Sequence, residues 1–229
     1  DTNVFLEASI SKVVTTLLEA FILVFLVVYL FLQDFRSTLI PAIAVPVSIV
    51  GTFFFLNLLG YSLNLLTLFA LVLAIGIVVD DAIVVVEAVH AKMEHGFSDA
   101  KKATVSAMDE ITGAIISITL VMAAVFIPVT FITGPTGVFY QQFGITLIVA
   151  ILISAVNALT LSPVLCSLFL KPNPAHHKEY TSMNFLQKFF YKFNAAFKSG
   201  TDRYGRLFVF LLRHKWVTLV IFAIGGLFF

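Results

Sequence analysis

Charged residues and cysteine are both scarce in this sequence. The first shortage argues against a soluble domain, and the second excludes a disulfide framework. Charged residues make up 12% of the 229, against about 25% in an average soluble domain, whereas 60% are hydrophobic. The mean hydropathy is +1.03. With Cys166 as its single cysteine, the chain has no disulfide framework. This composition indicates a polytopic membrane protein rather than a soluble domain.

The first residues of this sequence also lack any resemblance to a signal peptide. Residues 1–12 (DTNVFLEASISK) are polar and mixed, without a basic segment leading into a short apolar core and a cleavage site. Crossing about 30 Å of hydrocarbon takes about 20 apolar residues. Five stretches qualify: 13–32, 40–59, 63–89, 111–132 and 143–170. A sixth begins at Trp216, but residues 216–229 rise only about 21 Å as a helix. We therefore expect an all-α polytopic bundle with five complete transmembrane helices, in a chain that begins and ends inside a longer protein.

Basic residues are nearly absent from every second connection between these stretches. The connections at 60–62 and 133–142 contain none, and Lys12 is the only one of the 14 basic residues on that side. The others lie in the alternate connections and after the fifth stretch. Because cytoplasmic loops are enriched in Lys and Arg, we predict that the basic side is cytoplasmic and that the N-terminus of this chain and the GPTG loop face outward.

Two cytoplasmic stretches have helical patterns of their own. Gly96 can end the third transmembrane helix, and Ser98 followed by Asp99 resembles an N-cap leading into the fourth. Residues 184–197 place phenylalanines and a leucine on one arc and lysines on the other, as in an amphipathic helix on the cytoplasmic membrane surface. The expected organisation has three parts: transmembrane helices in 1–170, a linker with the surface helix in 171–215, and the start of another transmembrane helix in 216–229.

Two adjacent carboxylates, Asp80 and Asp81, are the only ionisable side chains in residues 68–86 (LFALVLAIGIVVDDAIVVV). An ionised carboxylate at mid-bilayer depth costs about 2.5–3.5 kcal/mol on insertion scales. The pair therefore requires a compensating partner, a water-filled cavity or protonation. We interpret it as a charge-bearing site inside the membrane. The structural alternative is a helix-packing residue satisfied by a hydroxyl or a backbone group.

A helical projection separates the two carboxylates. Asp80 and Glu87 share a stripe within about 20°, whereas Asp81 points about 100° away, toward a second neighbour or a water path. Gly76, one turn outward of Asp80, would let another helix approach closely. Burial disfavours the ionised form, and two close carboxylates disfavour double ionisation. Such a pair can load and release protons, so we predict a proton relay at Asp80 and Asp81.

The remaining polar residues are weaker candidates. Glu19 in the first stretch has either a functional partner or a structural role, whereas Glu87, near the cytoplasmic end, fits a structural role better; both are accessory candidates, as is Gly76. Interhelical hydrogen bonds are expected for three asparagines: Asn57, Asn64 and Asn157. His176 and His177 have no further Cys or His nearby, which argues against a metal site. The basic residues near the surface helix fit contacts with anionic lipid better than nucleic-acid binding.

Several long blocks of the sequence closely resemble the resistance-nodulation-division (RND) transporters. These blocks are LVVYLFLQDFRSTLIPAIAVPVSIVGTFFFLNLLGYSLNLLTL, LVLAIGIVVDDAIVVVEAVHAKM and FIPVTFITGPTGVFYQQFGITLIVAILISAVNALTLSPVLCSLFLKP, and they cover nearly the whole chain. Within the superfamily they look like the hydrophobe/amphiphile efflux subgroup of the acriflavine-resistance protein B type. The five stretches would then be transmembrane helices two to six, in the N-terminal transmembrane half.

The resemblance implies a drug/proton antiporter and not an enzyme. Members of the subgroup are homotrimers in the bacterial inner membrane that export amphiphilic drugs, with a periplasmic adaptor protein and an outer-membrane channel as partners. Asp80 and Asp81 match the acidic pair of the family's proton relay, whose lysine partner lies outside this chain, as do the drug-binding domains. The outward side would be the periplasm. No cofactor is implied, and the coupling ion is H⁺.

Three other classes of membrane protein are alternatives to this one. Heavy-metal exporters of the superfamily tend to have a single Asp followed by a small residue, unlike the Asp-Asp pair. An intramembrane aspartyl protease brings its two carboxylates together from facing helices, and its Gly-x-Gly-Asp pattern is absent from residues 76–80 (GIVVD). A non-transporting membrane sensor or scaffold shares the helix bundle and stays open as an alternative.

Overall fold

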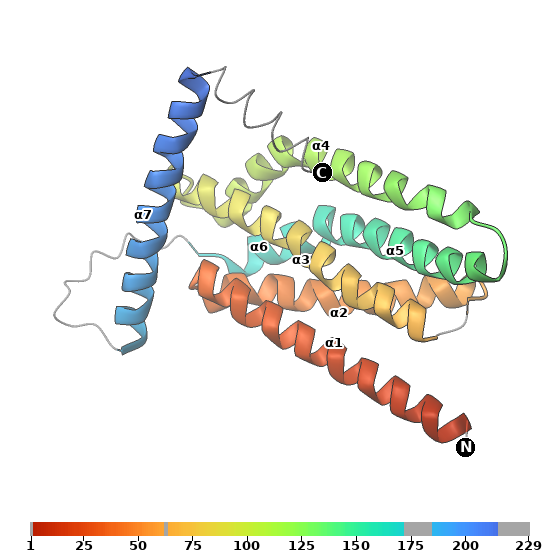
Figure 1. Cartoon of the computed structure of the whole chain (residues 1–229). Coiled ribbons are helices and arrows are strands. Elements are labelled where there is room, and N and C mark those ends of the chain that lie inside the picture. Colours follow the sequence, from red (N-terminus) through yellow and green to blue (C-terminus); the bar gives the residue numbers. More distant parts are fainter. Residues whose placement is uncertain (1, 62–63, 172–184, 215–229) are drawn as a thin grey trace. The chain divides into compact units, whose positions relative to one another are not determined.

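The computed structural model describes residues 2–61, 64–171 and 185–214, and every regular element in these ranges is a helix. The chain divides into two units, Asp1–Pro174 and Ala175–Phe229. In the first unit the helices form a bundle (Figure 1). Its elements are α1 (Thr2–Leu32), α2 (Phe35–Leu58), α3 (Leu65–Glu94), α4 (Ala100–Phe126), the 3₁₀ helix η1 (Ile127–Phe131), α5 (Pro135–Leu159) and α6 (Leu161–Phe169). The second unit contributes one described helix, α7 (Phe185–Arg213).

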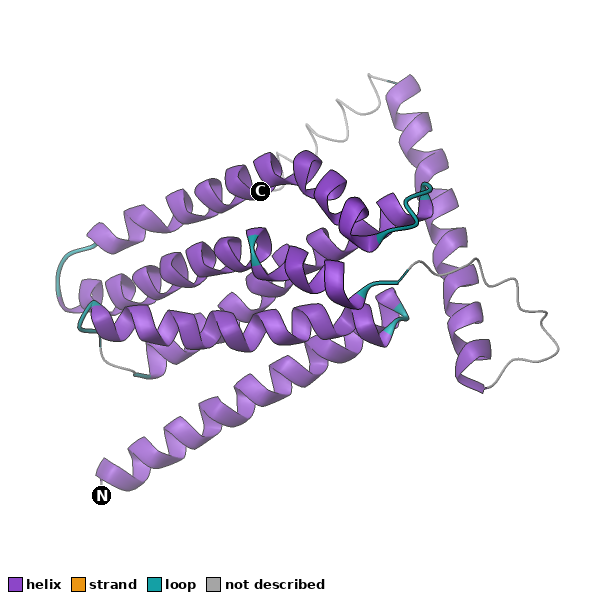
Figure 2. Cartoon of the chain, turned by 180° about the vertical axis from the view of Figure 1, so that it is seen from behind, coloured by secondary structure: helices purple, strands orange, loops and turns teal. Residues whose placement is uncertain are grey.

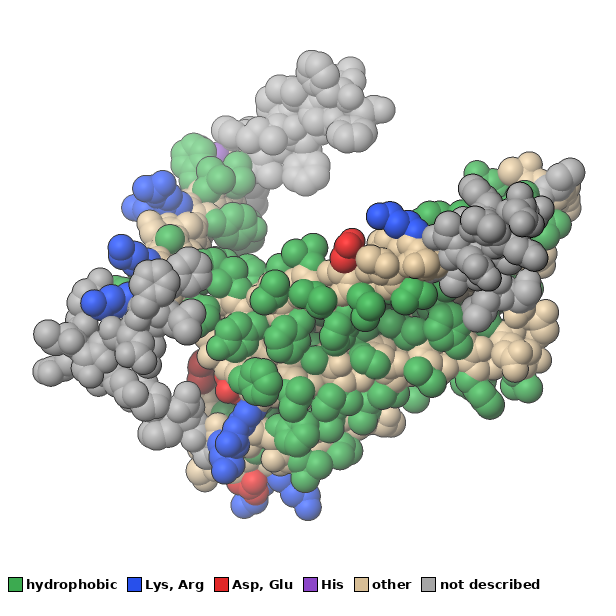
Figure 3. All heavy atoms as spheres, turned by 90° about the horizontal axis from the view of Figure 1, so that it is seen from below, with side chains coloured by type: hydrophobic (Ala, Val, Ile, Leu, Met, Phe, Trp, Pro, Cys, Tyr) green, Lys and Arg blue, Asp and Glu red, His purple; other side chains and the backbone are tan. Residues whose placement is uncertain are grey.

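Five helical segments of the described chain are long and apolar enough to cross a membrane, which confirms the predicted all-α, multi-pass fold. They are Val14–Leu32, Phe35–Leu58, Leu65–Glu94, Ala100–Phe131 and Thr136–Phe169. Hydrophobic side chains cover most of the bundle face in Figure 3, while Lys, Arg, Asp and Glu side chains lie mainly toward one end of the helices. An apolar outer surface with charges near the helix ends is the pattern expected of a protein surrounded by lipid.

The third membrane segment, α3, is the central helix of the bundle. It packs against α1, α2, α4 and α5, and also contacts α6. The side chains of Val85, Val86 and Val89 have no exposed surface at all. In contrast, α1 is largely exposed, and its N-terminal part diverges from the other helices, as Figures 1 and 2 both show. The groups on α3 are therefore placed by four neighbouring helices.

Capping side chains, a glycine and a proline explain where several helices begin and end. The side chain of Asp34 caps α2, that of Asn64 caps α3, and that of Asp99 caps α4. The N-cap of α4 is thus Asp99 rather than Ser98. As predicted, α3 stops just before Gly96, whose φ of 111° is unfavourable for any residue with a side chain. At Thr160, three residues before Pro163, the helix of the fifth stretch is interrupted between α5 and α6.

Two predicted boundaries are wrong. The fifth membrane helix begins at Pro135, not at residue 143, because Gly134 and Pro135 suit the N-cap and the first helical position, and most of the expected outer loop is helical. The amphipathic helix α7 continues to Arg213 instead of ending at 197, since no proline interrupts it and Tyr204, Phe208 and Leu211 keep its apolar arc. His176, His177 and residues 216–229 lie outside the described residues.

Candidate functional site

Asp80 and Asp81 lie near the middle of α3, whose first turn is fixed by a capping box. The side-chain oxygen of Asn64 accepts hydrogen bonds from the backbone N–H groups of Leu66 and Thr67, each at 3.0 Å. In return, the hydroxyl of Thr67 accepts a bond from the backbone N–H of Asn64 at 2.9 Å. The amide of Asn64 also bonds the side chain of Gln142 on α5. These contacts fix the register of α3 relative to α5 at the end of the bundle where α3 begins.

Asp81 faces α5 and is held by a hydroxyl of that helix. Its side chain is half-buried, and the Oγ of Ser154 donates a hydrogen bond of 2.5 Å to its Oδ2. Ser154 itself is only 1% exposed. Alanines on both helices, Ala74 on α3 and Ala150 on α5, are buried in the same contact and let the two backbones approach closely. This arrangement gives one carboxylate a specific partner on a second helix.

Asp80 points elsewhere, onto a face of α3 that no other described helix covers. Its side chain is exposed, and so are those at the other positions of this face: Leu73, Gly76, Val84, Glu87, Ala91 and Glu94. Within the described part of the chain, no atom lies within 4 Å of a Cβ added to Gly76. The close helix approach expected at Gly76 therefore stays a prediction, and so does a partner for Asp80.

The accessory candidates are not gathered around the pair. Glu19 is exposed on α1, and Glu87 is exposed two turns along α3 from Asp80. Among the described residues, neither glutamate forms a hydrogen bond or an ion pair. Their functional roles remain predictions that the geometry neither requires nor opposes.

Buried polar contacts between helices surround the site. The Nδ2 of Asn157 on α5 donates to the Oγ of Ser48 on α2 at 2.7 Å, and both side chains are at most 9% exposed. Interhelical bonding is thus confirmed for Asn157 and Asn64, whereas Asn57 is exposed on α2. The partner of Asp81, Ser154, was not among the predicted site residues. Its spacing of three residues from Asn157, on one face of an apolar helix, is the signal that could have indicated it.

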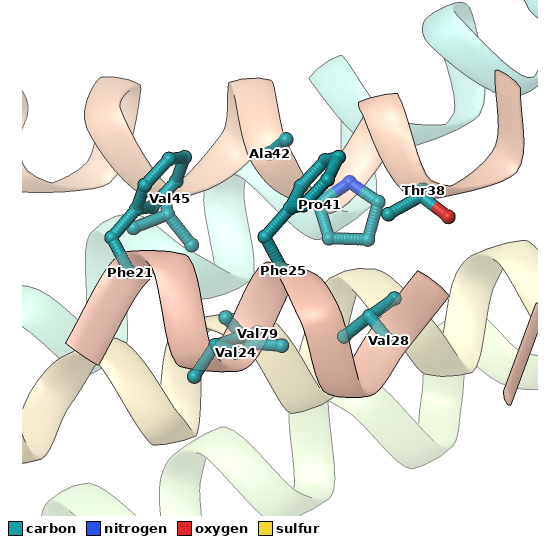
Figure 4. Close-up of a pocket in the computed structure, with 9 residues that line it drawn as sticks. All are labelled: Phe21, Val24, Phe25, Val28, Thr38, Pro41, Ala42, Val45 and Val79. Carbon is teal, nitrogen blue, oxygen red and sulfur yellow. The ribbon is translucent and has the colours of Figure 1, made fainter. Parts of the chain in front are cut away.

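No drug-sized pocket is found beside the carboxylates in the described part of the chain. The pocket between α1 and α2 in Figure 4 is lined by apolar side chains, among them Phe21, Phe25 and Val45, with Thr38 at one end. It offers about 10 Å³, which is roughly the space of one water molecule. In the described residues no group of His, Cys, Asp and Glu side chains has the arrangement of a metal site.

Five apolar helices of membrane-spanning length, the central one of which carries two adjacent carboxylates, define a multi-pass membrane protein. Comparison with known proteins identifies the group more closely. The chain belongs to the AcrB/AcrD/AcrF family, whose model matches residues 1–227. This confirms the resemblance to RND transporters drawn from the sequence blocks.

Named relatives are efflux proteins of two bacterial genera. The chain is 50% identical over 204 residues to the multidrug export protein AcrF of Escherichia coli (strain K12), covering 89% of this chain and 19% of the relative. It is 47% identical over 204 residues to the multidrug resistance protein MdtF of the same strain, with the same coverage. It is 43% identical over 226 residues to the toluene efflux pump membrane transporter TtgE of Pseudomonas putida, covering 98% of this chain and 21% of the relative. The chain thus spans about a fifth of the length of these relatives.

Proposed function

We propose that this chain is the proton-relay part of an RND transporter that exports amphiphilic compounds in exchange for protons. The observation that carries the proposal is the asymmetric pair on α3: Asp81 is bonded to Ser154 of α5, while Asp80 lies on the uncovered face. Two carboxylates in a membrane helix are costly unless they bind protons or a cation. The names of the relatives, which include multidrug export and toluene efflux, support the same function.

The proposed cycle uses protonation to change helix packing. A proton from the outer side converts a carboxylate of the pair into a neutral acid and weakens its attraction to the lysine that the family resemblance places outside this chain. Protonation of Asp81 at Oδ2 also replaces the charge-assisted bond from Ser154 with a weaker neutral one, which loosens α3 from α5. Each proton crossing the membrane supplies about 2.3 kcal/mol per 100 mV of potential, enough to shift the balance between two packings.

The distribution of basic residues and the family of the chain support a proposal for its membrane and its orientation. We propose a location in the bacterial inner membrane, with the basic connections in the cytoplasm and the N-terminus of this chain in the periplasm. The amphipathic α7 then lies on the cytoplasmic membrane surface. The complete protein is proposed to be a homotrimer that works with a periplasmic adaptor and an outer-membrane channel.

Two alternative functions belong to the same superfamily. A non-transporting sensor or scaffold would use the same bundle without proton flow. A heavy-metal exporter is disfavoured by the Asp-Asp pair, and no relative reported above is named for metal transport.

Dye export from living cells tests the proposal. The full-length transporter that carries this chain is expressed in a pump-deficient host, and the same host expresses Asp81→Asn, Asp80→Asn and, as a matched control, Asp99→Asn in the cap of α4. We expect both pair variants to retain dye like cells without a pump, while the Asp99 variant exports. Normal export by either pair variant, at equal protein levels, would overturn the proposal.

A further inference from the structure

Three side chains from two helix segments form a hydrogen-bonded chain at the basic end of the bundle. The Oγ of Ser37, at the start of α2, donates to the Oδ2 of Asp34 at 2.7 Å and lies 2.7 Å from the Nε2 of His90 on α3. Asp34 is also the N-cap of α2 and accepts the backbone N–H groups of Arg36 at 3.3 Å and Ser37 at 3.2 Å. Among these three residue types, histidine is the one whose side chain exchanges protons in the range between about pH 5 and 8.

Counting hydrogens determines which nitrogen of His90 is protonated. A serine hydroxyl has one hydrogen, and that of Ser37 is donated to the Asp34 carboxylate. The bond between Ser37 and His90 therefore requires the Nε2 of His90 to donate, so Nε2 carries the hydrogen. The lone pair of the neutral ring is then on Nδ1, which can accept a proton without breaking the chain. The resulting imidazolium would face the Asp34 carboxylate through Ser37.

His90 lines a polar pocket of about 510 Å³. The charged side chains around it come from every neighbouring segment: Asp34 before α2, Arg36 on α2, Glu94 on α3 and Lys171 after α6. Two of these are acidic and two are basic, so their formal charges cancel. A group in this position can take up and release protons without a strong charge of one sign opposing either step.

The same helix connects His90 to the carboxylate pair. On α3, Asp80, Glu87, His90 and Glu94 fall within an arc of about 80°, and His90 is about 15 Å from Asp80 along the helix axis. The fully buried Val85 and Val89 occupy the opposite side of the helix. Glu87 and His90 are three residues apart, which makes them neighbours on the helix surface. The titratable groups thus form a stripe from the middle of the membrane to its basic end.

We propose that His90, held by Ser37 and Asp34, is the proton-accepting group at the cytoplasmic end of this stripe and receives protons that leave Asp80 by way of Glu87. The inference rests on the proposed proton relay. The proton arrives at Nδ1 of the neutral imidazole and leaves from the same atom into the pocket, so that the ring returns to its starting tautomer.

Export rates at controlled cytoplasmic-side pH test this role in the full-length transporter, reconstituted in proteoliposomes. His90→Gln keeps an amide that can donate to Ser37 but cannot titrate, and His95→Gln makes the same change at an exposed histidine whose Nδ1 contacts only its own helix at Ala91. We expect His90→Gln to slow export severalfold and to remove the rate step between about pH 5 and 8. The His95 variant should keep both the rate and the step.

An unchanged pH profile in His90→Gln overturns the inference, because a histidine that only ties α2 to α3 is replaced by an equivalent donor. Export by Asp81→Asn in the same vesicles would instead overturn the underlying proton relay, so the two failures are distinguishable. Nitrogen-15 NMR of the histidines in the unmutated protein provides a second measurement. The His90 signals are assigned with His90→Gln or, if that variant does not fold, with His90→Asn. An Nε2–H tautomer that gains a proton between about pH 5 and 8 supports the role, and an Nδ1–H tautomer contradicts it.

Discussion

Asp80 and Asp81 are adjacent in sequence but lie in different surroundings. The 100° step of an α-helix directs Asp81 against α5, where Ser154 donates to it, and leaves Asp80 on the face of α3 that the described helices do not cover. The two carboxylates can therefore have different tasks. In the proposed relay, protonation of Asp81 acts on α5 through the hydrogen bond from Ser154, and Asp80 interacts with groups outside this chain.

Removing the hydroxyl of Ser154 should impair export without unfolding the bundle. Hydrogen bonds to charged groups contribute about 1.5–3 kcal/mol, so we expect Ser154→Ala to lower the dye-export rate roughly tenfold or more. Ser154→Thr, which keeps the hydroxyl, should retain more activity than the alanine variant. The matched control is Ser117→Ala, because the Ser117 hydroxyl bonds only the carbonyl of Gly113 in its own helix. Equal rates in Ser154→Ala and Ser117→Ala would show that the bond to Asp81 has no part in transport.

Close packing at the start of α5 is a requirement that hydropathy does not reveal. A Cβ added to Gly137 would overlap the backbone carbonyl of Ile132, which cannot move aside without distorting the turn between η1 and α5. Gly113, inside α4, has no described atom within 4 Å of an added Cβ. The two glycines thus offer a matched pair for testing this turn.

We expect Gly137→Ala to reduce the amount of folded transporter, since overpacking typically costs about 1–3 kcal/mol. Gly113→Ala should be neutral or stabilising, because alanine is favoured over glycine inside a helix by about 0.5–1 kcal/mol. Size-exclusion chromatography of detergent extracts, with a fluorescent tag on the protein, measures the folded fraction. If the two variants give the same folded fraction, the close contact at Ile132 is not important for folding.

Sequence patterns predicted the membrane helices well and their ends less well. Long apolar runs identified all five spans, and Gly96 correctly ended α3 because its positive φ is a strictly local requirement. The start of α5 was missed because residues 135–142 are too polar to count toward a span, although Gly134 and Pro135 favour a helix start. Ser154 was missed because its spacing of three residues from Asn157 indicates a shared helix face but not which side chain of another helix it meets. The contact between Ser37 and His90 joins positions 53 residues apart, which no local pattern could indicate.

The positive-inside topology makes a prediction for the complete transporter. With cysteines outside this chain replaced, Thr133→Cys should react with a membrane-impermeant maleimide added to spheroplasts, and Ser98→Cys should react only after lysis. Both positions are exposed in connections between helices. The native Cys166 has no exposed surface, so it should contribute little background. Reaction of Ser98→Cys, but not of Thr133→Cys, in intact spheroplasts would reverse the proposed orientation.

The relatives of this chain are much longer than the chain itself, and this bears on the uncovered face of α3. The chain covers about a fifth of AcrF, and the uncovered face of α3 carries Gly76, Asp80 and Glu87. A small residue one turn from a membrane carboxylate is the arrangement expected where another helix packs closely. We infer that the partner of Asp80 comes from the part of the transporter beyond this chain, which accords with the lysine implied by the resemblance.

Substrate-dependent proton flux is the most direct test of the proposed relay. Proteoliposomes that contain the full-length transporter and an internal pH-sensitive dye are given a proton gradient, and proton movement is recorded with and without an amphiphilic substrate. The account predicts that substrate accelerates proton movement in the unmutated protein and that neither Asp80→Asn nor Asp81→Asn shows any acceleration. Substrate-dependent proton movement at the unmutated rate in either variant would contradict it.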